Sequence, residues 1–384
     1  MATDTDETRR VREEDMARLR AAADAVGASK MRGGSWFRRI VKSRLEHRAL
    51  GQPPGTWDRL YPGLGDDQRA DERIRRAARR CAIAGGFASV GTSSGELLAL
   101  FTEGLGAPIG MPMAALSMGA EAAYTALVQI DLACDLASIY GVPFLADDMG
   151  EVTTLFGLAL GVDIRKRTDD DDDDHHGLTA RLMRLEDGEI ATRIGRKLLE
   201  DAFVRNVIPV AGTAISARLN YVGTARLGAA AKRYVRYRRA LVGACGRLGF
   251  HGVADPRFLI EGAWLLATVD GDAGHEEMLA LALLVDQLPP ARRADLGLGA
   301  LGDDEERWFE ALPYVAEELR GPLLDVLFLI AAADRQLEPA ERRFLRRVGK
   351  ALGREIDLPR VAAIGRHLAR GEAPPPGFLG LGPG

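Results

Sequence analysis

The chain of 384 residues contains few aromatic residues and almost none of the patterns that are typical of β-strands. Aromatic residues make up 6% of the chain, whereas Ala and Leu dominate the 47% that is hydrophobic. Ala and Leu are strong helix formers, and alternation of β-branched with polar residues is nearly absent. We therefore predict an all-α fold, and a chain of this length should form two helical domains.

Cysteines are also few. Cys81, Cys134 and Cys245 lie too far apart in the sequence for a redox pair or a metal knuckle. An odd number of cysteines argues against a disulfide framework, which favours a reducing compartment. The segment Met1–Arg20 is charged throughout, so we expect no secretory signal there. We predict a cytoplasmic protein, with a peripheral position at the inner face of the cell membrane as the alternative.

Basic residues are missing from a long central tract. The segment from Cys81 to Ile164 contains no Lys or Arg, although acidic residues occur along it. Its longest uncharged stretch, Gly104–Ala120, is interrupted by Pro108 and Pro112. A membrane-spanning helix needs about 20 continuous apolar residues, and this stretch is both shorter and broken. We therefore predict buried helices rather than a transmembrane segment.

Two acidic residues of this tract, Asp131 and Asp135, are spaced i,i+4 on an apolar helix. Two like charges on one buried face need cationic partners, because an unpaired buried charge is strongly destabilising. Basic side chains greatly outnumber acidic ones in the segment 181–240. We expect the partners to come from that segment, with Arg196, Arg205 and Arg218 as candidates. A structural ion pair is favoured over a catalytic carboxylate pair.

Two basic segments, Lys30–Leu50 and Lys232–Arg239, leave three interpretations open. In the first segment the apolar side chains share one helical face and the basic ones lie on the other. The apolar residues of that face are Trp36, Phe37, Ile40, Val41 and Leu45. The segments could cover the acidic tract, dock on an anionic membrane surface, or bind nucleic acid. We rank them in that order, because no nucleic-acid-binding signature accompanies them.

An acidic pattern occurs twice in the C-terminal half of the chain. In each copy an Ala-rich apolar run ends at an Asp and a Glu follows at the same spacing, first at Asp270 and Glu277 and then at Asp334 and Glu341. Together with Asp272, these carboxylates form a candidate site for a divalent cation, with Ca²⁺ or Mg²⁺ favoured. The alternative is that each Asp caps a helix and each Glu favours its first turn. We expect no organic cofactor.

The two copies are not equal. Gly271 and Asp272 of the first copy correspond to Arg335 and Gln336 in the second. A cation close to the site opposes metal binding, so we expect the first copy to hold the ion. His275 lies within the first copy, and a histidine beside two glutamates is expected to be solvated.

Two other patterns are weaker. The run Gly91-Thr92-Ser93-Ser94-Gly95 matches the nucleophile motif of serine hydrolases, which requires a strand before it. The preceding Ala82–Val90 is rich in Gly and Ala in a helical context, so we predict a turn between packed helices and no enzyme. The run Asp169–Asp174, followed by His175 and His176, predicts a solvated loop near 168–180 rather than a metal site.

Residues 70–240 resemble the EcsC family, a helical bacterial family. The stretches that carry the resemblance are Arg79–Gly86, Gln129–Gly141 and Ile208–Gly212, together with Asn220 and Gly223. Residues 255–370 resemble the TerB, or tellurite-resistance, family. That resemblance implies a small helical domain of two similar halves, each with an Asp-Gly…Glu corner implicated in metal binding.

These observations predict four segments: 1–69, charged with a basic amphipathic helix; 70–245, EcsC-like; 255–370, TerB-like; and 371–384, a flexible tail. Neither resemblance implies established catalysis. We therefore expect a non-enzymatic adaptor of a bacterial stress response or of the cell envelope. Its expected partner is a protein of unknown identity, with a membrane protein complex included. An anionic membrane surface is the alternative, and we do not expect nucleic acid.

Overall fold

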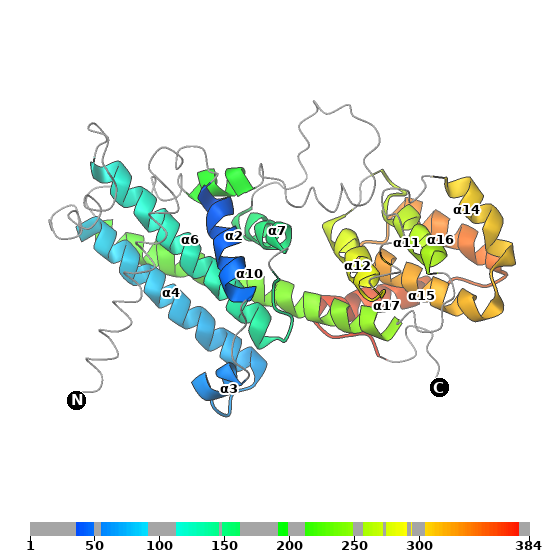
Figure 1. The fold of residues 1–384 in the computed structure, drawn as a ribbon, viewed down its shortest axis with the longest axis horizontal. Coiled ribbons are helices and arrows are strands. Elements are labelled where there is room, and N and C mark those ends of the chain that lie inside the picture. Colours follow the sequence, from blue (N-terminus) through cyan, green and yellow to red (C-terminus); the bar gives the residue numbers. More distant parts are fainter. Residues whose placement is uncertain are drawn as a thin grey trace. The chain divides into compact units, whose positions relative to one another are not determined.

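The structure is a computed structural model (Figure 1). It describes residues 36–49, 55–90, 113–145, 148–161, 191–198, 212–248, 256–271, 274–289, 293 and 304–375. This part of the chain is 81% helical and contains no strand, which confirms the all-α prediction. The chain separates into two compact units, and among the described residues the division falls between Tyr234 and Val235. That point lies inside helix α10 (Gly212–Leu248), whereas we predicted a boundary between 246 and 255.

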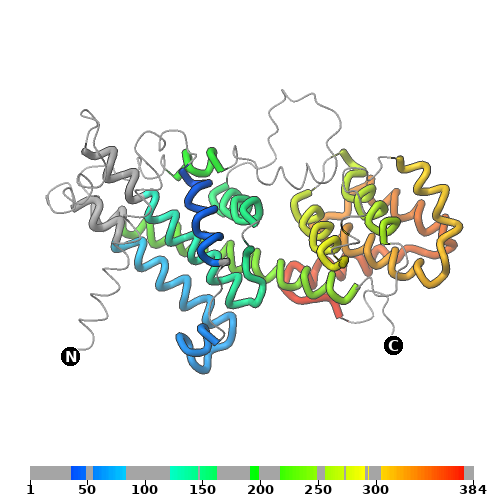
Figure 2. Tube along the Cα trace, in the orientation of Figure 1, coloured from blue at the N-terminus to red at the C-terminus, as the bar shows by residue number. Residues whose placement is uncertain are grey.

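The first unit is a bundle built on two long helices, α4 (Asp66–Val90) and α6 (Met113–Ile139), which pack along each other. The other helices of this unit are α2 (Trp36–Ala49), α3 (Thr56–Leu60), α7 (Met149–Leu160), residues 191–198 and the first part of α10. Figure 2 follows these helices in the blue-to-green part of the trace. Two acidic residues in the first turn favour the start of α4, and Gly161, with φ of +65°, ends α7.

Helix α6 is the core of the first unit. Its 18 residues from Ala122 to Ile139 are long and apolar enough to cross a membrane, and 94% of them are buried inside the protein. The central helix of a folded domain has the same composition. Helix α10 approaches closely at Gly228, where an added Cβ would lie 2.9 Å from Ile74 on α4 and 3.1 Å from Leu132 on α6. The missing side chain therefore lets three helices meet.

Helix α2 confirms the predicted amphipathic segment. All five residues of its predicted apolar face are buried, and α2 packs against α6 and α7. The rings of Phe37 and Phe156 are 5.2 Å apart, and Trp36 meets Phe37 edge-on. Arg38 and Lys42 lie on the exposed side. The apolar face is thus used for packing within the first unit.

The second unit is centred on helix α15 (Glu317–Ala333), in which every residue from Leu323 to Ala333 is buried. The helices in contact with it are α11 (Arg257–Ala267), α12 (His275–Asp286), α16 (Pro339–Leu352) and α17 (Leu358–Ala369). Helix α14 (Glu305–Ala311), a short 3₁₀ helix (Leu312–Tyr314) and the end of α10 complete the unit. A helix buried on all sides in this way forms the core of a helical domain.

Aromatic packing joins α11, α14 and α16. Trp308 on α14 lies against Gly262 on α11, where an added Cβ would be 2.3 Å from the indole ring. The indole nitrogen donates a hydrogen bond of 3.0 Å to the carbonyl of Phe258. The ring of Phe309 meets the indole edge-on, and the ring of Phe344 stacks against it. Gly262 is therefore required by packing rather than by backbone conformation.

The beginning of the predicted flexible tail is held in place. Residues 371–375 are described, and Arg247 donates a hydrogen bond of 2.5 Å to the carbonyl of Pro374. Arg236 donates a hydrogen bond of 2.7 Å to the carbonyl of Arg370. The chain after α17 is therefore bound to the end of α10 as far as residue 375. The rest of the predicted tail lies outside the described residues.

Candidate functional site: two acidic corners

The two copies of the acidic pattern form equivalent corners of the second unit. The first joins α11 to α12 and the second joins α15 to α16. In the first, the amide of Gly271 donates to the carbonyl of Thr268 over 2.9 Å. In the second, the amide of Arg335 donates to the carbonyl of Ala332 over 3.3 Å. The same turn is thus made at matching positions of the two copies, which supports a structural repeat.

Each corner places its glutamate in the first turn of the following helix. Glu277 Oε2 accepts a hydrogen bond of 2.7 Å from the amide of Gly274, the N-cap of α12. Glu341 Oε2 accepts one of 2.6 Å from the amide of Glu338, the N-cap of α16. Both glutamates therefore satisfy a backbone N–H that a helix start would otherwise leave unpaired. This confirms the predicted role of the glutamates in the first turn.

The aspartates do not have the capping role that the alternative interpretation gave them. Asp270 lies in the turn after α11, and Asp334 is the C-cap of α15. Asp334 Oδ1 accepts a hydrogen bond of 2.8 Å from the amide of Gln336, so it stabilises the turn instead. The N-cap prediction for the aspartates is wrong, because several residues separate each aspartate from the start of the next helix. The N-caps are Gly274 and Glu338 instead.

The two glutamates meet in the interior. Glu277 is 7% exposed and Glu341 is 3% exposed, and their carboxyl groups interact electrostatically. Burial raises the pKa of Glu277 to about 8, and the charges of Glu341, Asp334 and Asp270 add to this effect. Burial likewise raises the pKa of Glu341 to about 7, with further contributions from Asp334 and Asp270. Four of the five predicted ligands therefore interact electrostatically.

A shared proton explains how two buried carboxyl groups can lie together. Within the described part of the chain, no N–H or hydroxyl group donates to Glu341 Oε1, which is buried. Two buried carboxyl groups that lie side by side do not both ionise without a nearby cation, because their negative charges would repel each other. The pair therefore retains at least one proton at neutral pH.

The donor set matches hard cations, but it is not assembled as a metal site. Among the described residues, no group of three or more His, Cys, Asp or Glu side chains is arranged to hold a metal ion. Asp272 lies outside the described residues. Carboxylate oxygens are the ligands that Ca²⁺ and Mg²⁺ prefer, and a buried oxygen without a donor is available to them. Binding would require these side chains to move closer together.

Sequence reasoning did not identify two residues near these corners correctly. His275, which we expected to be solvated, is the first residue of α12 and is half-buried; burial lowers its pKa. Tyr237 on α10 donates a hydrogen bond of 3.1 Å to the carbonyl of Ala333, just before the second corner, and burial raises its pKa. No sequence pattern linked Tyr237 to a corner so distant along the chain.

Asp131 and Asp135 are ion-paired as predicted, but with other partners. Arg44 Nε lies 2.9 Å from Asp131, Arg48 Nη1 lies 2.7 Å from Asp135, and Arg73 Nε lies 2.6 Å from Asp135. Burial opposes the charge of Arg48, yet the two aspartates outweigh it and raise the pKa of the guanidinium. The network spans α2, α4 and α6, so its role is structural.

The three arginines that we predicted as partners of this pair are not among those found. Arg196 and Arg218 are exposed, and Arg205 lies outside the described residues. A sequence signal was nevertheless available, because Arg44 and Arg48 are spaced i,i+4 like the two aspartates. Two helices that pack side by side can match such pairs along their length.

The remaining motifs fall mostly outside the described residues. This is the case for Gly91–Gly95, with Ser93 and Ser94, and for the acidic and histidine run at 169–176. The residues just before the serine motif belong to α4, which extends to Val90. The nucleophile motif of hydrolases requires a strand at that point.

Replacing Arg335 by Gly is expected to stabilise the second unit by about 1 kcal/mol, because a side chain in the left-handed region is strained. Arg335 has φ of +69°, the one positive φ of a non-glycine residue in the described part of the chain, and Gly271 has φ of +88° at the equivalent position. Urea unfolding measures the effect. The control is Arg335→Ala, which removes the charge and keeps the strain; an equal gain for R335A would contradict this explanation.

Comparison of the chain with protein-family models, with curated proteins and with solved structures gave no match.

Proposed function

We propose that this protein is a non-enzymatic adaptor whose second unit alters its surface when a divalent cation binds between the two acidic corners. The observation that carries the proposal is the contact between Glu277 and Glu341, which occupy equivalent positions of two helix–turn–helix halves. A helical unit of two similar halves with acidic corners is what the TerB resemblance implies. The helical bundle around α6 is compatible with the EcsC resemblance of residues 70–240.

The residues of the corners would act as follows. Without a cation, Glu277 and Glu341 share a proton, and each is held by its helix N-cap. A bound Ca²⁺ or Mg²⁺ would supply the charge that allows both carboxyl groups to ionise together. Asp270 and Asp334 would contribute further oxygens, and Asp272 belongs to the same corner in the sequence. All of these donors are oxygens, which favours Ca²⁺ or Mg²⁺ over Zn²⁺.

The position of the corners supports the proposed adaptor role. Each corner connects two helices of one half, and α15 of the second half packs against α11 and α12 of the first. Drawing the carboxylates together would stiffen the contact between the halves and change the surface that they present. We propose a protein partner in a stress response or at the cell envelope, a membrane protein complex included. The proposed location is the cytoplasm.

A protein partner ranks above an anionic membrane surface. The peripheral membrane alternative relied on the apolar face of α2, and this face is buried. Arg38 and Lys42 remain exposed on the other side of α2. Charges alone interact weakly with a bilayer and add only about 1 kcal/mol for each basic residue.

Calorimetric titration of the full chain tests the cation site. We expect binding of Ca²⁺ or Mg²⁺ with a dissociation constant below 1 mM (an estimate on the order of weak extracellular sites), and weaker binding of Zn²⁺. The affinity should increase from pH 6.5 to pH 8, because the shared proton must leave before both glutamates can ionise. The titration should release protons into the buffer.

Two variants make this test specific. Glu277→Gln keeps an oxygen for the amide of Gly274 but cannot ionise, so binding should be lost. Glu318→Gln changes an exposed carboxylate at the start of α15 and should leave binding unchanged. The proposal is excluded if no cation binds more tightly than about 1 mM, or if E277Q binds as tightly as the unchanged chain.

A further inference from the structure

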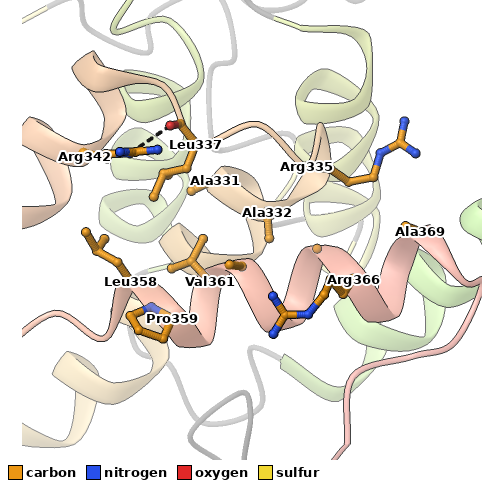
Figure 3. A pocket seen from close by; sticks show the side chains of 12 residues that line it. Ala331, Ala332, Arg335, Leu337, Arg342, Leu358, Pro359, Val361, Arg366 and Ala369 are labelled. Atoms are coloured by element: carbon orange, nitrogen blue, oxygen red, sulfur yellow. Dashed lines mark hydrogen bonds between the residues drawn. The ribbon is translucent and has the colours of Figure 1, made fainter.

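A pocket of about 490 Å³ lies between the second corner and α17 (Figure 3). Its residues come from the end of α15, the turn that follows it, the start of α16 and one face of α17. This volume is in the range of pockets that bind small molecules. The twelve lining residues include three arginines and no acidic residue. The arginines are Arg335, Arg342 and Arg366.

The wall of the pocket formed by α17 is made of small residues. Ala362, Gly365 and Ala369 lie on the same face of the helix, and Val361 and Leu358 extend the apolar lining. An added Cβ on Gly365 would lie 3.2 Å from the carbonyl of Ala332, so glycine permits close approach of α17 to the corner. The pocket therefore combines an apolar lining with a cationic rim.

The guanidinium groups at this rim have few partners within the protein. Arg342 Nε donates a hydrogen bond of 3.0 Å to the carbonyl of Leu337, which holds its side chain in place. Figure 3 shows Arg342 and Arg366 on different sides of the apolar residues, whereas the guanidinium of Arg335 points away from them. Within the described residues, none of these three arginines forms an ion pair. Arg342 and Arg366 are therefore available to an anion.

The repeat gives an independent reason to regard this rim as a specialised feature. At the position of Arg342 the first half has Met278, which is buried, and at that of Arg335 it has Gly271. Arg335 occupies a left-handed backbone conformation that glycine would adopt without strain. Strained residues of this kind are often found at binding sites. The second half thus differs from the first by gaining charge beside the pocket.

We propose that this pocket binds a small amphipathic anion, with an apolar body against α17 and a phosphate or carboxylate group bound at the rim by Arg342 or by Arg366. Guanidinium groups form paired, charge-assisted hydrogen bonds with such groups. The apolar residues would bury the body of the ligand. This site is separate from the acidic pair and does not require a divalent cation.

Titration of the full chain with 1-naphthyl phosphate and with 1-naphthoate, in the presence of EDTA, tests the proposal. EDTA keeps the acidic corners free of metal, so the result does not depend on the proposed cation site. We expect at least one of the two anions to bind by ligand-observed NMR. Neutral 1-naphthol and inorganic phosphate should each bind at least about tenfold more weakly, because each provides only half of the interactions.

Variants locate the site. At least one of Arg342→Gln and Arg366→Gln should weaken binding about five- to tenfold, as expected for loss of a charge-assisted contact. Arg346→Gln removes an exposed arginine of α16 that does not line the pocket, and it should have no effect. Ala362→Trp should block the pocket while every charge remains. The proposal is overturned if neither anion binds, if the double variant R342Q/R366Q binds normally, or if R346Q weakens binding equally.

Discussion

Lowering the pH from 8.5 to 6.5 without divalent cations is expected to increase the free energy of unfolding of the second unit. The pKa values of Glu277, about 8, and Glu341, about 7, lie above the ordinary value of 4.5. Between these limits the folded protein binds more protons than the unfolded chain, so its stability falls as the pH rises. The loss is complete once both groups have ionised. We expect a total change of roughly 2–5 kcal/mol.

Other titratable groups of the second unit also contribute to the pH dependence of its stability. Burial lowers the pKa of His275 below its ordinary value of 6.5, so below about that pH the protonation of this histidine in the unfolded chain opposes the stabilisation that the glutamates provide. Burial raises the pKa of Asp325 to about 7 despite its contact with Arg360, and burial also raises the pKa of Asp334. These two carboxyl groups act in the same direction as the glutamate pair. Some pH dependence should therefore remain when the pair is altered.

Urea unfolding at several pH values, followed by hydrogen exchange of peptides from α12 and α15, measures this change. Glu277→Gln should remove most of the pH dependence, because Gln accepts the same N-cap hydrogen bond without ionising. Glu318→Gln, at an exposed position, should keep the full dependence. Equal stability at pH 6.5 and 8.5, or an unchanged slope in E277Q, would show that the two glutamates do not share a proton.

Replacing Asp135 by Asn should destabilise the first unit by about 3 kcal/mol, because it leaves buried arginines without their counter-charge. Asp135 is 5% exposed at its side chain, and Arg73 and Arg48 are 12% and 21% exposed. Arg48 keeps a longer contact of 3.5 Å with Asp131, whereas Arg73 loses its ion pair with Asp135. The partial exposure of the arginines places the effect at the low end for buried pairs.

The matched control is Asp58→Asn, which removes an ion pair with Arg69 in which the carboxylate is 70% exposed. Exposed pairs contribute about 0–1 kcal/mol, so this variant should unfold almost like the unchanged chain. Hydrogen exchange of peptides from α6 reports on the first unit. If D135N and D58N have the same small effect, the network contributes no more than a surface pair.

The fold class was predictable because it depends on local properties of the chain. Helix propensity and the spacing of apolar residues predicted the helices around α2 and α6 correctly. The face of α2 was also predictable, since Trp36, Phe37 and Leu45 lie on one side of any helix through them. The observed division between the units differs from the predicted one. Helix α10 continues without a break through this point, and no turn residue marks it in the sequence.

The candidate site was predicted less completely. The repeat identified Glu277 and Glu341 because equal spacing in two halves is visible in the sequence. Their burial, their mutual interaction and their raised pKa values depend on how the halves pack, and no local pattern encodes that. The N-cap roles that the alternative interpretation gave to Asp270 and Asp334 were wrong, since the length of a turn decides which residue caps the next helix.

The sequence by itself therefore determined the helical character of this protein, the amphipathic face of α2 and the existence of two acidic corners. These features follow from interactions among residues a few positions apart. The tertiary structure alone decided that Arg44, Arg48 and Arg73 pair with the buried aspartates, and that the two corner glutamates meet. It also decided that Arg342 and Arg366 border one pocket. Such contacts join residues far apart in the sequence, and they form only when whole helices pack together.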